Sequence, residues 1–163
     1  MTAATIRPVR ADDAPAVWQV FQRAVHEGAA GHYTAEQLHD WAPSAEIPEG
    51  YAPWLLRHHT LVADEDGQIT GFFMLEESGY LNMAFVLPER RGSGLAARLY
   101  EMTLAHARAE GMTHLTVWAS RMFHRFLRRR GWVDDPAPPP LEGHPIPTTD
   151  AEPIDYPLKL DLP

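Results

Sequence analysis

The residues best suited to chemistry lie in one short stretch, where an apolar run meets a glycine-rich turn. The run over 81–87 leads into Pro88, a charged turn follows, and Gly92 and Gly94 then open an amphipathic helix. The first amides of a helix have no partner within it, and the helix dipole places partial positive charge beside them. Glycine also lets an anion approach the backbone closely. The stretch therefore predicts a phosphate site at a helix N-terminus.

Two common phosphate-binding motifs do not fit this turn. A nucleotide P-loop has a lysine and then a serine or threonine after its second glycine, whereas this chain has Leu95 and Ala96 there. A dinucleotide fingerprint needs a third glycine and an acidic residue at the end of the next strand. The next expected strand ends over 118–120, which reads Trp-Ala-Ser. The sequence thus predicts a phosphate ligand of another kind.

The composition is typical of a globular chain without membrane spans. The 163 residues are 45% hydrophobic and 22% charged, and none is cysteine. No apolar run is long enough to span a membrane, and the N-terminus lacks the apolar core of a signal peptide. Without cysteine there is no disulfide, thiolate metal site or cysteine nucleophile, and the histidines show no ligand pattern for a metal. We therefore expect a cytoplasmic protein that binds no metal and no membrane.

The formal net charge of -8 argues against nucleic acid as the main partner, because binding a phosphate backbone requires clustered cations. An acidic chain suits a cationic amine substrate. One cationic cluster exists, and two interpretations stay open: a solvated helix face, or part of an anion site. Its members are Arg121, Arg125, Arg128, Arg129 and Arg130.

Hydrophobic periodicity and turn residues predict the elements that position the glycine turn. Before the turn we expect a strand over 5–9, a helix from an Asp12 or Asp13 cap to about Glu27, a short helix from the Thr34–Gln37 capping box to Trp41, a helical piece over 52–58, and strands over 60–63, 68–75 and 80–87. After the turn we expect a helix to Glu110 closed by Gly111, a strand over 113–119 and a helix over 120–130.

These elements imply an α/β fold. Three consecutive strands form an antiparallel meander, and the strand–helix–strand crossover over 80–119 makes its two strands parallel. We expect a central mixed, mostly antiparallel sheet with helices on both faces, in a single domain over 1–163.

The composition changes after Trp132, since nine of the fifteen prolines lie beyond it. Such a composition is typical of a disordered tail, but apolar residues alternate over 156–162 and predict a returning strand. Pro157 requires an edge position or a bulge there. The expected parts are a core over 5–133, a proline-rich loop over 134–153 and a C-terminal strand over 154–162.

In this order of elements the chain resembles the GCN5-related N-acetyltransferases (GNAT) from Ile6 to Trp132. The turn over 91–96, Arg-Gly-Ser-Gly-Leu-Ala, is similar to the family's Arg/Gln-x-x-Gly-x-Gly/Ala signature. The segment over 126–132 is similar to the family's Phe-Tyr-x-x-x-Gly-Phe ending, and the stretch over 26–41 resembles a subgroup of small bacterial acetyltransferases. The resemblance implies the GNAT fold, with acetyl-coenzyme A (acetyl-CoA) as co-substrate.

The resemblance also implies how the donor is held. Backbone amides between Arg91 and Ala96 would bind the pyrophosphate, and the pantetheine arm would pair with the strand at 84–86 as an added strand does. The amide near Ala84 would stabilise the oxyanion of the tetrahedral intermediate. The expected cofactor-binding residues are Ala84, Phe85, Val86, Arg91, Gly92, Ser93, Gly94, Leu95, Ala96 and Phe126.

The proton-transfer groups depart from the family pattern. The usual tyrosine acid falls at Leu127, which has no proton to give. The carboxylate base of histone-acetylating members falls at Tyr80, and Asn82 is the next residue on that face of the strand. Neither is an ordinary base at neutral pH. The routes left open for the proton of the amine are ordered water, His26, Glu27 and Tyr33. The expected catalytic residues are Ala84, Tyr80, Asn82 and His26.

In this family the first helices and their loop form one wall of the acceptor site. The expected substrate-binding residues are His26, Tyr33, Trp41, Trp118 and Ser120. A structural role competes with each assignment: His26 as a partly buried helix residue, Tyr33 and Trp41 as packing residues, and Ser120 as a helix cap.

We therefore expect an N-acyltransferase that moves the acetyl group of acetyl-CoA to a primary amine of a small molecule or peptide, by direct attack in a ternary complex. The alternative is a non-catalytic acyl-CoA-binding module of the same fold, for which Leu127 is the best support. A member directed at nucleic acid would need a basic face that the chain lacks outside 121–130. A homodimer stays open.

Overall fold

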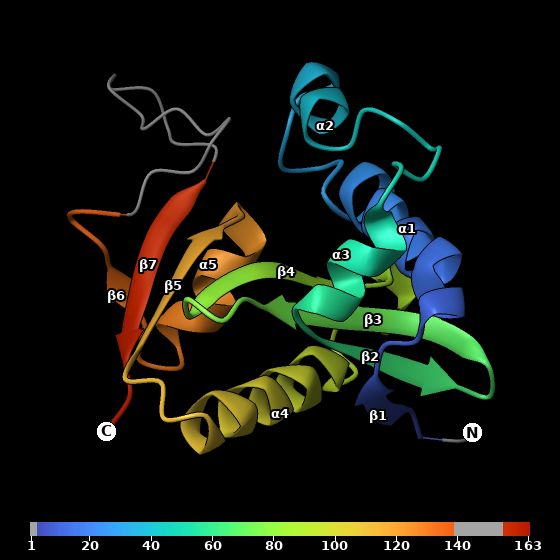
Figure 1. The fold of residues 1–163 in the computed structure, drawn as a ribbon. Helices are drawn as coiled ribbons and strands as arrows, with labels where there is room; N and C mark the ends of the chain where they lie inside the picture. Colours follow the sequence, from blue (N-terminus) through green and yellow to red (C-terminus); the bar gives the residue numbers. More distant parts are fainter. Residues whose placement is uncertain (1–2, 139–154) are drawn as a thin grey trace.

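The computed structural model describes residues 3–138 and 155–163, and its centre is a seven-stranded sheet with helices on both faces (Figure 1). The strand order is β1-β2-β3-β4-β5-β7-β6. Among the described strands, β4 and β5 are parallel and all other neighbours are antiparallel, which confirms the expected mixed sheet. The strands are β1 (Thr5–Pro8), β2 (His59–Glu65), β3 (Gln68–Leu75), β4 (Tyr80–Val86), β5 (His114–Ala119), β6 (Val133–Asp134) and β7 (Tyr156–Asp161).

Two groups of helices cover the two faces. α1 and α3 pack on one face and α4 and α5 on the other, and each group has its own apolar core (Figure 1). The helices are α1 (Ala14–Arg23), α2 (Ala35–Trp41), α3 (Tyr51–Arg57), α4 (Leu95–Ala109) and α5 (Arg121–Arg128). Shorter turns are η1 (Ala11–Asp13) and η3 (Pro88–Arg90), which are 3₁₀, and η2 (Ala24–Gly28), which is a π-helix.

β3 is an interior strand of the sheet, and its side chains are apolar toward both layers. Phe72 and Met74 belong to the core below α1, and Phe73 and Leu75 belong to the core below α4. All four are at most 1% exposed. A strand buried on both faces reads as a continuous apolar run rather than an alternating one. Each such side chain contributes about 1.5–3 kcal/mol by leaving water.

Three helix boundaries follow from residues that the sequence marks. Gly111, with φ of 75°, follows the end of α4. The Ser120 hydroxyl accepts a hydrogen bond from the amide of Phe123 at 3.2 Å and caps α5. Thr34 and Gln37 form the reciprocal capping box of α2.

The first helix is shorter than expected. The sequence predicts one helix to about Glu27, whereas α1 ends at Arg23 and the π-helical turn η2 follows. The carboxylate of Asp13 does not cap α1. It accepts from the amide of Arg10 at 2.7 Å instead, within the turn that precedes the helix.

β4 carries a bulge at Asn82. The residues on either side of it pair with consecutive residues of β3, so Asn82 has no partner in that register. The alternation of side chains is therefore interrupted, and Leu81 and Ala84 pack in the same core although they are three residues apart. The bulge interrupts the alternation from which Asn82 was expected to share a face with Tyr80, and that expectation stays a prediction.

β7 lies inside the sheet rather than at its edge, because β6 pairs with its outer side. Asp134 pairs with Leu158 in β7, so the expected proline-rich loop does not begin at residue 134. Pro157 lies one residue beyond the register with β6, and its missing amide proton costs no bond to β5, because the amide and carbonyl of a strand residue point to the same side and the carbonyl of Pro157 faces away from β5. Its carbonyl accepts from the amide of Asp135 at 3.0 Å. The rest of that loop, 139–153, and the first residue of the expected strand, Ile154, lie outside the described residues.

No helix within residues 3–138 and 155–163 has the length and apolar character needed to cross a membrane.

Candidate active site

β4 and β5 separate after a short parallel contact, and the separation leaves one edge of β4 open (Figure 1). Tyr80 pairs with Thr116 and Leu81 pairs with Val117. β5 then continues along β7 on its other side. The part of β4 over 82–86 has β3 on one side and no described strand on the other. We refer to residues 82–86 as the open edge of β4.

The amides of Ala84 and Val86 face the open side. The amide of Leu87 donates to the carbonyl of Thr70 in β3 at 2.8 Å. Because successive amides along a strand point to opposite sides, the amide of Phe85 also faces β3, and those of Ala84 and Val86 face away from it. A free strand edge of this kind can hydrogen-bond an extended ligand as an added strand.

Four amides at the glycine turn and the start of α4 have no acceptor among the described residues; they belong to Gly92, Gly94, Ala96 and Ala97. Gly92 and Gly94 have φ of 74° and 86°, which glycine adopts without strain. An added Cβ at either would meet nothing within 4 Å, so backbone conformation and not space requires glycine here. The positive end of the α4 dipole lies at the same place.

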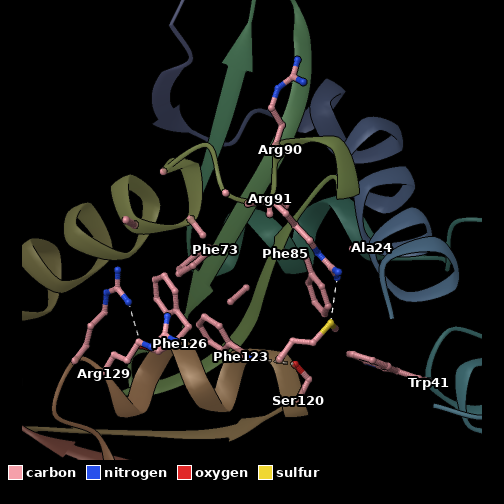
Figure 2. A pocket seen from close by; sticks show the side chains of 18 residues that line it. Ala24, Trp41, Phe73, Phe85, Arg90, Arg91, Ser120, Phe123, Phe126 and Arg129 are labelled. Atoms are coloured by element: carbon pink, nitrogen blue, oxygen red, sulfur yellow. Dashed lines mark hydrogen bonds between the residues drawn. The ribbon is translucent and has the colours of Figure 1, made fainter. Parts of the chain in front are cut away.

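A cavity of about 460 Å³ joins this turn to the open edge of β4 (Figure 2). All four residues with free amides line it. α5 forms the facing wall, and Trp41 of α2 lies at the end away from α4 (Figure 2). The cavity therefore connects an anion-binding turn to a strand edge with free hydrogen-bonding groups.

The cavity is cationic. Four arginines and no acidic side chain line it within the described part of the chain. One of them, Arg90, is paired with Glu65 at 2.7 Å and holds the pKa of that carboxyl below its usual value. The other three are Arg91, Arg129 and Arg130. In a chain of net charge -8, this concentration of positive charge favours an anionic ligand.

Arg91 reaches across the cavity. Its Nη2 contacts the sulfur of Met122 at 3.2 Å, on α5 (Figure 2). It also lies against Gly28 in η2, where an added Cβ would come within 2.6 Å of the guanidinium. The π-helical turn thus places a glycine where this guanidinium approaches the backbone closely.

Aromatic rings line the middle of the cavity. Phe123 and Phe126 of α5 stack with centroids 5.3 Å apart, and Phe73 meets Phe123 edge-on at 5.8 Å (Figure 2). Toward the other end, Trp41 lies 5.9 Å from Phe85. An apolar wall with a few placed polar groups is typical of a ligand pocket.

The comparison with known families decides the identity of the fold. A family model described as an acetyltransferase (GNAT) domain matches residues 29–149. The chain belongs to the GNAT family. An uncharacterized N-acetyltransferase of Archaeoglobus fulgidus is 31% identical to this GNAT chain over an alignment of 93 residues, with 49% of this chain and 63% of that relative covered. The chain therefore matches less than two thirds of the length of this relative.

Solved structures agree with the GNAT fold. A GCN5-related N-acetyltransferase from Rhodopseudomonas palustris has a TM-score of 0.82 and 25% identity, with 99% of this chain and 98% of that one covered. The PaiA N-acetyltransferase from Thermoplasma acidophilum, solved with coenzyme A, has a TM-score of 0.74 and 17% identity, with 99% and 100% covered. The resemblance expected from the sequence is confirmed at the level of family and fold.

Eight of the ten residues expected to bind the donor line the cavity of this GNAT chain. Ser93 and Leu95 do not. The Ser93 hydroxyl donates to the carbonyl of Arg90 and accepts from the amide of Leu95, and the Leu95 side chain is in the core. Ser93 and Leu95 therefore stabilise the glycine turn and do not face the cavity. The eight lining residues are Ala84, Phe85, Val86, Arg91, Gly92, Gly94, Ala96 and Phe126.

Three of the expected catalytic residues lie outside the lining, and only Ala84 is part of it. The Asn82 amide group donates to Glu76 at 2.9 Å. The Nε2 of His26 lies 2.8 Å from the carbonyl oxygen of Ala42, so this nitrogen carries a proton and donates it to that bond. Burial raises the pKa of Tyr80, which keeps its phenol neutral.

Two of the expected substrate-binding residues, Trp41 and Ser120, line the cavity, whereas His26, Tyr33 and Trp118 do not. The Tyr33 hydroxyl accepts from the amide of Arg121 at 2.8 Å, and its ring lies 5.6 Å from that of Trp41. Ser120 combines its lining position with the helix-cap role.

Eight lining residues were not expected. Ala97 could have been predicted from the sequence, because its amide, like that of Ala96, lies in the first turn of the helix and has no acceptor within it. Phe73 was hidden because every β3 residue around it is apolar. The charge pattern marked Arg129 and Arg130 but not the direction in which they face. The eight are Ala24, Phe73, Arg90, Ala97, Met122, Phe123, Arg129 and Arg130.

Proposed function

We propose that this chain is an acetyl-CoA-dependent N-acyltransferase that acetylates a primary amine of a small molecule or peptide. The observation that carries the proposal is one cavity that joins the open edge of β4 to the free amides of the glycine turn. These two features match the two ends of a coenzyme A thioester, a pyrophosphate and an extended arm with amide groups. The same fold holds coenzyme A in the PaiA structure.

In this proposal the backbone does most of the donor binding. The amides of Gly92, Gly94, Ala96 and Ala97 receive the pyrophosphate, where each bond to a charged group contributes about 1.5–3 kcal/mol. The arm adds to the open edge of β4 through Ala84 and its neighbours. The stacked rings of α5 exclude water from its apolar part.

The chemical step is attack of an amine nitrogen on the thioester carbonyl carbon. A C–N bond forms as the carbonyl oxygen becomes an oxyanion, and the C–S bond then breaks to release the coenzyme thiolate. The outward amide of Ala84 donates to the oxyanion, a contact worth roughly 3 kcal/mol in comparable sites. The amine loses its proton to water, because the described lining holds no carboxylate and no histidine.

The leaving thiolate is stabilised by Ser120 in this proposal. Its Oγ accepts from the amide of Phe123, which leaves the hydroxyl proton available to the cavity. A thiol with a pKa near ~8.5 leaves as a thiolate without full protonation, so a hydrogen bond can replace the missing acid at Leu127.

One observation favours the alternative of a non-catalytic acyl-CoA-binding module. Leu127 is 0% exposed and packs in the core below α5, so no proton donor stands where the resemblance places the tyrosine. In that case the cavity would bind the coenzyme and the acceptor end would serve no reaction.

Calorimetric titration of the full chain with coenzyme A, followed by turnover of acetyl-CoA with a panel of primary amines, tests the two functions. Because the chain has no cysteine, the released coenzyme thiol can be titrated without background. We expect one coenzyme per chain and thiol release that depends on the amine. Binding without turnover of any amine would favour the alternative, and no binding would contradict both.

Several finer expectations stay predictions. They are His26 as a base in place of water, Tyr80 and Asn82 as catalytic residues that do not take up the proton, Tyr33 and Trp118 as amine-binding residues, the single domain over 1–163, a bacterial and cytoplasmic setting, and a homodimer.

A further inference from the structure

The C-terminal end of α5 brings two arginines, Arg129 and Arg130, to the cavity wall. We propose that they form a second phosphate subsite, separate from the glycine turn, which binds the 3′-phosphate of coenzyme A and lets the chain distinguish it from 3′-dephospho-coenzyme A. This inference rests on the proposed function and adds to it a determinant of donor specificity.

Arg130 is held in place by three contacts. Its guanidinium carbon lies 3.6 Å from the ring centre of Phe126 and 5.6 Å from that of Tyr100, and Nη1 donates to the carbonyl of Phe126 at 3.0 Å. Tyr100 is in the second turn of α4, so this guanidinium extends from α5 to α4. It therefore lies toward the helix whose first turn carries the free amides. A stacked guanidinium is pre-organised and keeps its remaining N–H groups for an anion.

Two arginines close to this pair in space or in sequence are neutralised by carboxylates, whereas Arg129 and Arg130 are not within the described part of the chain. Arg90 pairs with Glu65, and Arg128, next to Arg129 in the chain, lies 3.5 Å from Asp134. Within residues 3–138 and 155–163, no carboxylate pairs with Arg129 or Arg130. The sequence left open whether the arginine cluster over 121–130 is a solvated helix face or part of an anion site. Arg129 and Arg130 line the cavity and the other three arginines do not, so the cluster contains both kinds of residue.

The order of features along α5 matches the order of groups in the donor. Ser120 begins the helix and Arg129 follows its end, and they lie at opposite ends of the cavity wall (Figure 2). The thioester would lie near Ser120 and the open edge of β4. The nucleotide end would then lie near Arg129 and Arg130, beyond the pyrophosphate. A guanidinium fork matches the oxygens of a phosphomonoester, which carries close to two negative charges at neutral pH.

The competing interpretation is structural. Cations at the C-terminal end of a helix interact favourably with its dipole, and Arg129 and Arg130 directly follow the last residue of α5, so no ligand is needed to explain them. It predicts equal affinity for the phosphorylated and the dephosphorylated coenzyme, whereas a phosphate subsite predicts a difference.

Calorimetric titration of the wild-type chain with coenzyme A and with 3′-dephospho-coenzyme A tests this. We expect the dephosphorylated form to bind about tenfold more weakly, the effect of one charge-assisted hydrogen bond at a partly exposed site. Raising the salt concentration should reduce the difference, because exposed charges are screened. Equal affinities in low salt would overturn the subsite. Absence of binding by both ligands would overturn the proposed function and the subsite with it.

Substitutions assign the difference to residues. The Arg129→Gln, Arg130→Gln double variant should lose about tenfold in affinity for coenzyme A and keep its affinity for the dephosphorylated form within twofold. The matched control is Arg125→Gln, which removes one charge from the exposed side of the same helix and should change neither. Thermal unfolding reports folding, and Arg129→Gln alone tests the subsite without disturbing the Arg130 stack. A full tenfold preference in both the single and the double variant would overturn the assignment.

Discussion

The two ends of the cavity are made of different parts of the chain. The proposed donor end comprises the glycine turn and the open edge of β4, and most of the polar groups that it offers to a ligand are backbone amides. At the acceptor end the ligand-facing groups are side chains, such as Trp41, carried on short elements. α2 has seven residues and one of them, Leu38, is buried, whereas α4 has fifteen and six are buried. The donor end is therefore built into the core of the fold, and the acceptor end can be remodelled at little cost in stability.

The difference has a chemical meaning. A backbone amide cannot be replaced by substitution, so under the proposed function the amides keep their contacts to the pyrophosphate and the arm when the side chains around them change. Side chains on α2 and η2 can change one at a time, so they can adapt the same donor chemistry to different amines. This contrast between the two ends of the cavity requires that a substitution at one end leave ligand binding at the other end unchanged.

The largest expected effect is at the donor end, with Gly94→Val. A valine at a φ of 86° costs about 1–3 kcal/mol, and the amides it carries turn away from the cavity. Coenzyme affinity should fall by roughly 100-fold, the loss of one or two hydrogen bonds to a charged group. Calorimetric titration with coenzyme A measures it. The fold should survive, because this strain is smaller than the stability of a typical domain, ~5–15 kcal/mol.

Gly111→Val is the matched control for this change. It lies just past the other end of α4 with φ of 75°, and an added Cβ there meets nothing within 4 Å, as at Gly94. Both variants should lose similar thermal stability, and only Gly94→Val should lose coenzyme affinity. If both variants lost affinity equally, the effect would come from strain in α4 and not from the amides of the turn.

The next largest effect is the pH dependence of turnover, which reports on the acceptor end. Burial raises the pKa of Tyr33 and of Tyr80, so both phenols stay neutral below their ordinary pKa near ~10 and cannot remove the proton of the amine. At pH values below the pKa of the amine, kcat/KM should rise about tenfold per pH unit and level off at that pKa. Profiles for two amines of different basicity measure this, and their plateaus should shift with the amine.

A protein base would give a different result. An inflection at the same pH for both amines, lost in His26→Ala, would place a base at the acceptor end. Proton transfer would then be a side-chain function, and the acceptor end would take part in the chemistry as well as in binding.

The donor end could be predicted from the sequence because its determinants are local. A positive φ next to a helix start requires glycine, and the apolar runs and turn residues set the strands on either side. The separation of β4 from β5 was not predictable in this way. It depends on strand pairing across some 35 residues and on the bulge at Asn82, which no residue pattern in β4 marks.

The acceptor end was predicted less well because its residues act through their side chains, and the direction in which a side chain points cannot be read from the sequence. The helical spacing places His26 on a continuous α-helix, but His26 lies within the π-helical turn η2, where the α-helical periodicity no longer holds. His26 consequently donates to Ala42 and lies outside the cavity lining. Arg129 shows the same limit, since its charge was visible and its orientation toward the cavity was not.

The smallest expected effect tests whether the acceptor end can change alone, through Trp41→Ala. The Trp41 ring lies 5.6 Å from that of Tyr33 and 5.9 Å from that of Phe85, at the end of the cavity away from α4 (Figure 2). Its loss should raise the KM for the amine about fivefold, the value of one aromatic contact, and leave coenzyme affinity within twofold. Steady-state kinetics measures the KM, and calorimetric titration measures the coenzyme affinity.

Trp54→Ala is the control for this change, because Trp54 of α3 is also partly buried and stacks on Tyr51 outside the lining. A fall in coenzyme affinity in Trp41→Ala alone would show that the two ends are coupled through Phe85, and the acceptor end could then not diversify without disturbing the donor end.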